Sequence, residues 1–320
     1  MLSLKLCEGT WDVLQDQRIL LTGVTGRIGG AIAAALAPTN VVWGLARYGR
    51  AGSMEEVERT GVIPLRGDFS RDSLENIPPE LDYVVHVAAD IRPHSAEAGM
   101  QDNSDGAARL MSRCRNAKAF LHVSATGVYA QHSDPYFVYP ETADLGGAYG
   151  GLYSATKLAG EGAVRAAAQI LDLPTIICRQ NVQYGGGGTD PGLIDRFLDH
   201  LVNTGEILLP ASGPLVIGPI HEADIVDLIE PCLAAASVPA RIVNWGGDEP
   251  VDWQEMFEFA AELIGKTPKL VRRAEFNFPS CYPDPTARRA LAGQCKISWR
   301  DGVRRTLALR HPEIVLKASK

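Results

Sequence analysis

The sequence predicts an α/β protein: a doubly wound parallel sheet with a smaller C-terminal mixed α/β lobe that binds the substrate. Over the first 180 residues, short continuous apolar runs alternate with helical patterns. Strands that are apolar throughout are buried on both faces, as in parallel sheets covered by helices. Beyond about residue 180, glycine and proline become frequent and the alternation stops. That change in texture indicates a second, smaller unit.

Each element of the sheet follows from its own run of residues. The predicted strands are 18–22, one starting at 41, one starting at 62, 83–87, 119–123 and 175–178. The predicted helices are 28–36, 105–117, 152–171, 193–203 and a last one that opens on the capping pattern Asp252-x-x-Glu255 and runs to 264. We therefore expect a Rossmann-type domain over 1–180, to which 216–245 returns, and a substrate lobe made of 181–215 and 246–320.

Composition limits the classes of partner and site. The formal net charge is −7, whereas nucleic acids and anionic membranes select basic surfaces, so neither is expected as a main partner. The sequence contains no Cys-x-x-Cys pair and no His-rich spacing, so no metal site is expected. It shows no apolar run of transmembrane length and no signal-peptide pattern, so we expect a cytoplasmic protein.

A glycine-rich segment, Thr22-Gly-Val-Thr-Gly-Arg-Ile-Gly29, joins the first strand to the first helix. Gly23 permits a sharp turn, Gly26 lets the backbone approach a pyrophosphate, and Gly29 lets the helix pack on the strand. The helix start adds free N–H groups and the positive end of a dipole. A structural turn is the other interpretation, but the position between strand and helix favours a dinucleotide site. Its predicted contacts are Gly23, Thr25, Gly26, Arg27, Ile28 and Gly29.

The end of the second strand bears on the choice of dinucleotide. An acid there would bind the ribose 2′-hydroxyl, whereas an arginine can hold a 2′-phosphate. The run from 41 to Arg50 contains Arg47 and no acid, and Arg27 can point to the same place. Guanidinium groups bind phosphate through charge-assisted hydrogen bonds. NADP is therefore favoured over NAD, the other interpretation being solvated surface arginines.

Residues after the third and fourth strands are predicted to complete the cofactor site. Asp68 can accept a hydrogen bond from the adenine amino group, although a turn or cap role is equally compatible with its type; Phe69 follows it. Ala88 and Ala89 end the fourth strand with small side chains that let the cofactor lie close over the sheet.

The candidate catalytic pair is Tyr153 and Lys157, which lie four residues apart and so share a face of the predicted helix. A free tyrosine has a pKa near 10, and a nearby ammonium should lower it. Tyr153 could then transfer a proton while hydride moves to or from carbon, with Lys157 also bonding the nicotinamide ribose. Ser124 and Thr126, at the end of the fifth strand, compete as the hydroxyl that binds the substrate oxygen.

These residues together resemble the extended short-chain dehydrogenase/reductase family, which includes the NAD-dependent epimerase/dehydratases, over nearly the whole chain. The resemblance rests on 22–29, Asp68, 86–89, 103–106, 124–129, 153–157, 221–224, 244–247 and 299–302. It implies a nicotinamide dinucleotide, Asn103 as a support for the catalytic geometry, and dimerisation through the helices 105–117 and 152–171.

The chain also departs from the sugar-nucleotide members of that family. Ala125 stands where they usually place the catalytic Ser or Thr, whereas Ser124 fits the register of plant-type flavonoid and cinnamoyl reductases. Thr126 and Gly127 replace the acids of the dehydratases. The Asn that usually precedes Val-Tyr-Gly is displaced, and the segment 213–220 is apolar where those enzymes carry an arginine.

These departures favour a reductase. We expect an NADP(H)-dependent oxidoreductase that interconverts a carbonyl and an alcohol on a small apolar or aromatic substrate, in contact with Asp90, Tyr136 and Tyr184. One alternative is a sugar-nucleotide epimerase or dehydratase with bound NAD. Another is a non-catalytic NADP-sensing protein, against which the intact Tyr153–Lys157 pair argues.

Overall fold

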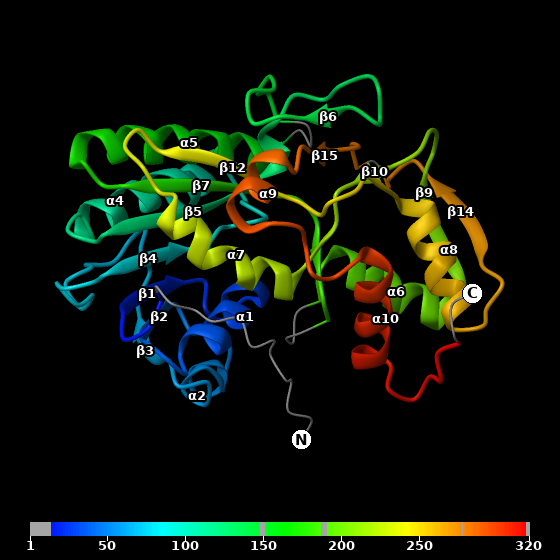
Figure 1. The fold of residues 1–320 in the computed structure, drawn as a ribbon, viewed down its shortest axis with the longest axis horizontal. Helices are drawn as coiled ribbons and strands as arrows, with labels where there is room; N and C mark the ends of the chain where they lie inside the picture. The colour runs from blue at the N-terminus through cyan, green and yellow to red at the C-terminus, as the bar shows by residue number, and fades with distance from the viewer. Residues whose placement is uncertain (1–13, 148–150, 187–190, 277, 318–320) are drawn as a thin grey trace.

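A computed structural model describes residues 14–147, 151–186, 191–276 and 278–317. Figure 1 shows a larger lobe and a smaller lobe side by side. The larger lobe is built on a parallel sheet with strand order β12-β7-β5-β4-β1-β2-β3. The strands are β1 (Arg18–Thr22), β2 (Val41–Ala46), β3 (Ile63–Arg66), β4 (Tyr83–His86), β5 (Ala119–Ala125), β7 (Thr175–Gln180) and β12 (Arg241–Trp245). This arrangement confirms the predicted fold class.

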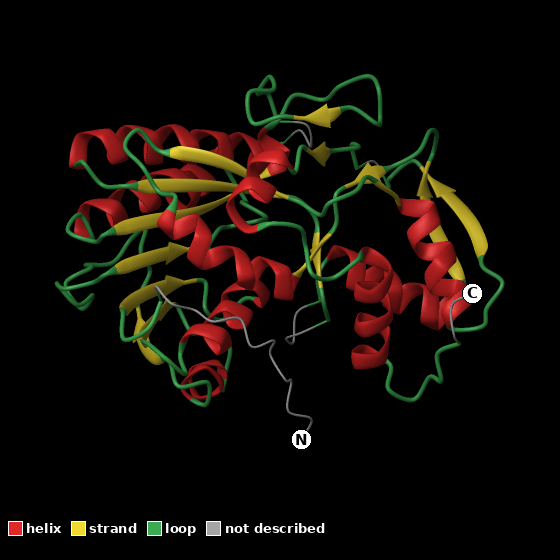
Figure 2. Cartoon of the chain, viewed as in Figure 1, coloured by secondary structure: helices red, strands yellow, loops and turns green. Residues whose placement is uncertain are grey.

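Helices cover both faces of this sheet (Figure 2). Side chains that point in opposite directions from each strand form two hydrophobic clusters. One cluster packs against α1 (Arg27–Leu36) and α7 (Glu222–Ala234), the other against α4 (Gly106–Arg113) and α5 (Leu152–Leu171). Burial on both faces explains why the strands are apolar without alternation.

The α4 region differs from the single predicted helix 105–117. A short helix, α3 (Ala96–Met100), runs into a π-helical turn, η1 (Gln101–Asp105), and then into α4, which ends at Arg113. A π-turn admits one extra residue into the helical ladder and is frequent at functional sites. Here it packs against α5, the helix that carries Tyr153 and Lys157.

The smaller lobe has its own core. It contains α6 (Leu193–Thr204), α8 (Trp253–Leu263), α10 (Trp299–Arg310) and the parallel pair β9 (Glu206–Pro210) and β14 (Lys269–Arg273). Leucine, tryptophan and phenylalanine side chains from these elements form a third cluster. Asp252 accepts hydrogen bonds from the N–H groups of Gln254 and Glu255 and so caps α8, as its capping pattern indicates.

Short two-residue pairs connect the lobes. They are β8 (Gln183–Tyr184) with β11 (Ile220–His221), β10 (Val216–Ile217) with β13 (Val251–Asp252), and β6 (Val138–Tyr139) with β15 (Tyr282–Pro283). The chain returns to the large sheet through α7 and β12. The helix α9 (Thr286–Ala292) also packs on α7, so part of the segment 246–320 belongs with the larger lobe. One further helix of the larger lobe, α2 (Ser53–Glu58), precedes β3.

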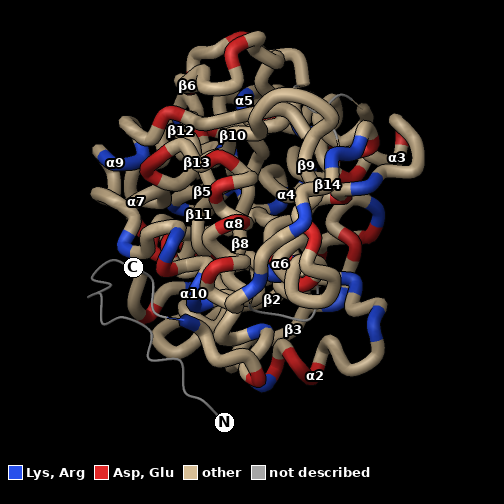
Figure 3. The backbone as a smooth tube through the Cα atoms, turned by 90° about the vertical axis from the view of Figure 1, so that its right-hand side faces the viewer, with Lys and Arg blue, Asp and Glu red and all other residues tan. Residues whose placement is uncertain are grey.

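The surface charges match the modest acidity of the sequence. In the view of Figure 3, Lys and Arg positions are interspersed with Asp and Glu positions. Among the described residues, no helix combines the length and the apolar character that crossing a membrane requires.

Candidate functional site

The glycine-rich loop forms a cradle at the carboxyl edge of the sheet. Gly23 has a φ of +72°, and a Cβ there would lie 2.9 Å from the backbone nitrogen of Ala88. A Cβ at Gly29 would clash with the carbonyl oxygen of Gly23. Both positions therefore need glycine, which keeps the turn sharp and brings α1 close to β1.

The start of α1 offers this cradle its N–H groups. Gly26 is the N-cap; no side chain caps the helix, and its first turn holds no acid. Thr25 is exposed, Ile28 packs against the core below, and the small Ala88 and Ala89 follow β4 across the edge. A pyrophosphate satisfies uncapped N–H groups at a helix start, so the residues fit a dinucleotide.

Arg27 does not lie where a 2′-phosphate would need it. Its guanidinium, almost fully buried, forms an ion pair with Asp195 of α6 and donates to Gln183 Oε1 at 3.1 Å. The expectation that its side chain reaches the end of β2 is therefore wrong, because the side chain crosses to the smaller lobe. Only its backbone remains available to the cradle.

The two predicted phosphate ligands that do follow β2, Arg47 and Arg50, have different surroundings. Arg50 is paired with Glu56. Arg47 is exposed, and its side chain has no ion pair among the described residues. One of the three predicted phosphate ligands is thus left with its charge uncompensated.

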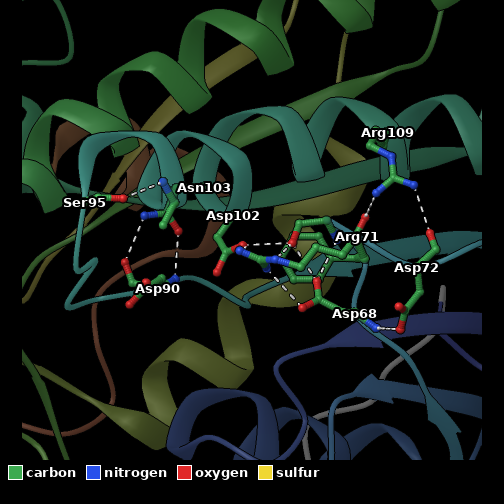
Figure 4. A network of polar contacts seen from close by, with 11 residues as sticks. Asp68, Arg71, Asp72, Asp90, Ser95, Asp102, Asn103 and Arg109 are labelled. Atoms are coloured by element: carbon green, nitrogen blue, oxygen red, sulfur yellow. Dashed lines mark hydrogen bonds and ion pairs between the residues drawn. The ribbon is translucent and has the colours of Figure 1, made fainter.

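Asp68 and Phe69 follow β3. Asp68 lies in a polar network that is drawn in Figure 4. The Asp68 carboxylate accepts from Ser70 N at 2.9 Å, Ser70 Oγ at 2.6 Å and Arg71 at 3.1 Å. Burial alone would raise its pKa, but these hydrogen bonds outweigh burial and hold the pKa below its usual range. Phe69 meets His86 edge-to-face, with ring centres 5.0 Å apart. Asp68 is thus a fixed carboxylate that closes its own turn, the role left open beside adenine binding, which stays a prediction.

Asn103 lies in the π-turn and ties the loop after β4 to α5. Its amide oxygen accepts from Asp90 N at 2.8 Å, and its Nδ2 donates to Asp90 O at 2.9 Å and to Thr156 Oγ1 at 3.0 Å. Figure 4 shows Asn103 facing Asp90. The side chain thus bonds to the helix that carries the candidate catalytic pair, and the supporting role that the resemblance implies stays a prediction.

Tyr153 and Lys157 lie one turn apart on α5, with Lys157 against the end of β5. The Lys157 ammonium is buried and donates to the carbonyl oxygen of Val123 at 2.7 Å. Burial lowers its pKa to about 8, against the attraction of Glu161. The Tyr153 hydroxyl has no hydrogen-bond partner among the described residues, and burial raises its pKa to about 12. Lys157 was expected to lower the pKa of Tyr153, but no side chain of the described residues does so.

The two candidate hydroxyls, Ser124 near the end of β5 and Thr126 directly after it, are both bonded to other side chains. Ser124 is buried and donates to Glu161 Oε1 at 2.6 Å. Thr126 is buried and accepts from Asn181 Nδ2 at 2.8 Å. Both hydroxyls thus have protein partners, and the expectation that Ser124 binds the substrate oxygen does not fit this geometry.

His86 on β4 and His122 on β5 are directly paired across the two strands, close to Lys157. The Thr22 hydroxyl accepts from Val87 N and Ala88 N, both at 3.2 Å, so its own proton goes to His86 Nδ1 at 2.7 Å. His86 therefore carries its proton on Nε2, an assignment inferred from the network. Burial lowers its pKa to about 3, helped by Lys157.

The predicted substrate contacts fall in three different settings. Tyr136 is 55% exposed on the loop between β5 and α5. Asp90 Oδ1 accepts from Arg92 N at 2.9 Å, which closes its own turn. Tyr184 is buried in the smaller lobe, where its hydroxyl donates to the Trp299 carbonyl. Tyr184 is therefore a core residue and the prediction for it is wrong.

A buried ion pair next to the candidate site was not predicted from the sequence. Glu161 of α5 binds Arg179 of β7 in a bidentate contact, at 3.0 Å from Nε and 2.8 Å from NH2. Arg179 also lies over the Tyr129 ring at 4.8 Å. A detectable signal was present, because Glu161 follows Lys157 by four residues and so shares its helix face.

Comparison with known proteins agrees with this geometry. The model of the NAD dependent epimerase/dehydratase family matches residues 19–246. The low-salt glycan biosynthesis protein Agl12 of Haloferax volcanii is 24% identical over 249 residues, which cover 75% of this chain and 79% of that protein.

Two solved structures are similar over nearly their whole length. UDP-glucuronic acid 4-epimerase from Bacillus cereus, in complex with NAD, has a TM-score of 0.79 and 19% identity, covering 92% of this chain and 96% of its own. dTDP-glucose 4,6-dehydratase from Bacillus anthracis, in complex with NAD, has a TM-score of 0.78 and 19% identity, covering 92% and 97%. At such identities the likeness shows a shared fold.

Proposed function

Because the chain belongs to the NAD-dependent epimerase/dehydratase family, we propose that it is a dinucleotide-dependent enzyme that acts on a nucleotide-linked sugar. The observation that carries the proposal is the Tyr153–Lys157 pair, with Lys157 fixed to the end of β5 beside the glycine cradle. The substrate class is supported by the relatives, which include an epimerase, a dehydratase and a glycan biosynthesis protein.

This substrate class replaces the small apolar molecule that the sequence favoured. That preference rested largely on the apolar segment 213–220. Its residues from Leu215 to Ile220 are buried, and they form β10 and β11 in the packing of the two lobes. Their apolar character is explained by this core and carries no information about a substrate.

The chemistry we propose is redox at a sugar carbinol, as in an epimerisation. A bound NAD supplies a hydride acceptor and donor. The Tyr153 phenol gives a proton to a substrate carbonyl oxygen as hydride arrives from the dinucleotide; in the reverse direction its phenolate takes the proton of the alcohol as hydride leaves to NAD. Dehydration needs an added acid and base, and Thr126 and Gly127 replace the acids expected there. Epimerisation or simple oxidation therefore fits these residues better than dehydration.

For the dinucleotide we propose NAD. The two solved structures described above are complexes with NAD, and in this chain Arg27 and Arg50 are already paired with carboxylates. NADP is the second candidate, because Arg47 is exposed and no acid follows β2. Calorimetric titration of the full chain with each dinucleotide separates them: tighter binding of NAD supports our proposal. Equal or tighter binding of NADP, weakened by Arg47→Gln, would reverse it.

The proposed substrate class is tested by thermal stabilisation. With NAD present, a panel of UDP- and dTDP-sugars should raise the melting temperature of the full chain, whereas small aromatic aldehydes and ketones should leave it unchanged. The reverse pattern would restore the carbonyl reductase interpretation. Stabilisation by a dinucleotide alone, with no response to either panel and no turnover, would favour the non-catalytic sensor.

We also propose that the chain forms a homodimer through α4 and α5. The outward face of α5 presents Leu152, Ala155, Gly162, Ala166 and Ile170, all exposed and all small or apolar. Light scattering on the full chain should give twice the monomer mass. Ala166→Glu should halve that mass because it buries a charge in the interface, and a monomeric wild type would refute the proposal. The matched control is Ala290→Glu, at an exposed position on α9, which should leave the mass unchanged.

A further inference from the structure

Glu161 is a buried carboxylate one turn along α5 from Lys157, and two other elements contact it. Ser124 of β5 donates to it at 2.6 Å, and Arg179 of β7 binds it in a bidentate contact. These contacts tie the Glu161 carboxylate to β5 and β7 at once.

Glu161 and Lys157 hold the same short piece of β5. Ser124, which donates to Glu161, follows directly on Val123, whose carbonyl oxygen accepts the Lys157 ammonium at 2.7 Å. Fixing the Ser124 side chain therefore fixes the peptide unit that orients Lys157. Glu161 can influence Lys157 both by its charge and through this peptide.

We propose that Glu161, acting with Ser124, is a positioning residue that keeps Lys157 charged and fixed at the end of β5. Ser124 thereby takes a supporting role in place of substrate binding. The effect on turnover rests on the proposed function, but the effect on Lys157 does not.

Burial disfavours the positive charge of Lys157, and the other groups around it are uncharged or already paired. Burial disfavours the ammonium and is the larger influence, lowering its pKa to about 8, while Glu161 raises it. His86 and His122 face the lysine from β4 and β5 and stay uncharged, since burial and Lys157 both lower their pKa. Arg179 is compensated by Glu161 itself. Among the described residues, Glu161 is thus the group that opposes burial.

The test is a direct titration of Lys157 by NMR of the full chain labelled with ε-13C lysine, the signal being assigned with Lys157→Arg. Glu161→Gln should lower the pKa of Lys157, a roughly tenfold change in its ionisation constant. Ser124→Ala keeps the ion pair and should lower it by less. Glu258→Gln, an exposed position on α8, and Ser112→Ala, exposed on α4, are the matched controls.

Glu161→Gln leaves Arg179 buried without its partner and can fail to fold. The double variant Glu161→Gln/Arg179→Gln then removes both charges and should still lower the pKa of Lys157. An unchanged Lys157 titration in Ser124→Ala and in whichever glutamine variant folds would overturn the proposal. Because no substrate is needed, this outcome is independent of the proposed function. Where turnover is found, Ser124→Ala should shift the pH profile of kcat and leave KM unchanged.

Discussion

At the scale of single residues, burial decides which side chains behind the catalytic pair carry charge. Burial lowers the pKa of His86 to about 3 and that of His122 well below 6.5. Neither ring nitrogen of His122 has a partner among the described residues. The folded chain therefore binds these protons less readily than the unfolded chain. The stability contributed by the neutral rings is complete above pH 6.5 and is lost as the pH falls through the window below it.

This predicts a measurable effect of His122→Phe. The free energy of unfolding should fall less steeply with decreasing pH below 6.5 than in wild type, by up to about 1.4 kcal/mol per pH unit. Urea unfolding at a series of pH values measures it. His94→Phe, at an exposed position, should keep the wild-type slope. Parallel slopes for His122→Phe and wild type would show that His122 takes up a proton in the fold as readily as in the unfolded chain.

At the scale of elements, one ion pair connects the phosphate cradle to the smaller lobe. Arg27, in the first turn of α1, reaches Asp195 in the first turn of α6, and both side chains are almost fully buried. Gly192 packs against the Arg27 guanidinium, so that a Cβ there would collide with it. The start of α1 is thus held from the smaller lobe as well as from β1.

Breaking this pair should destabilise the whole chain. Asp195→Asn removes the nearer of two carboxylates paired with the buried Arg27 guanidinium, the other being Glu222 at 3.8 Å, and should cost up to about 3–5 kcal/mol of unfolding free energy. Glu56→Gln removes the same type of contact from Arg50 at the surface and should cost little, because exposed pairs are weak. Chemical denaturation of both variants compares them. A loss for Asp195→Asn no greater than for Glu56→Gln would mean that Arg27 does not hold the lobes.

The elements also show how far the sequence could be read. The strands and long helices of the large sheet were predictable because each buries an unbroken apolar run or a periodic face. The π-turn η1 and the two-residue pairs such as β6 with β15 were not, since so short a segment carries no periodicity and pairs only with residues far away in sequence.

At the scale of the whole molecule, residue type indicated the chemistry but not the partner. Ser124 was rightly predicted at the edge of the sheet, yet its hydroxyl turns to Glu161 on α5. Arg27 lies in the phosphate loop, yet its guanidinium is paired with a residue 168 positions later. Tertiary packing decides such pairings, within the larger lobe for Ser124 and between the lobes for Arg27, so the sequence could place the site but not the roles of these two residues.

The central claim is that Tyr153 transfers the proton in a redox reaction on a nucleotide-linked sugar. The most direct measurement mixes the full chain, saturated with NAD, with nucleotide sugars and follows both the sugar, by chromatography, and nicotinamide absorbance, in wild type and in Tyr153→Phe. An epimerisation returns the hydride to the sugar and leaves no net NADH, so conversion of the sugar is the decisive signal. We predict conversion by wild type and a loss of roughly 100-fold or more in its rate in Tyr153→Phe, with NAD bound equally by both. Equal rates in the two proteins, or neither conversion of the sugar nor reduction of NAD by wild type with any sugar of the panel, would contradict it.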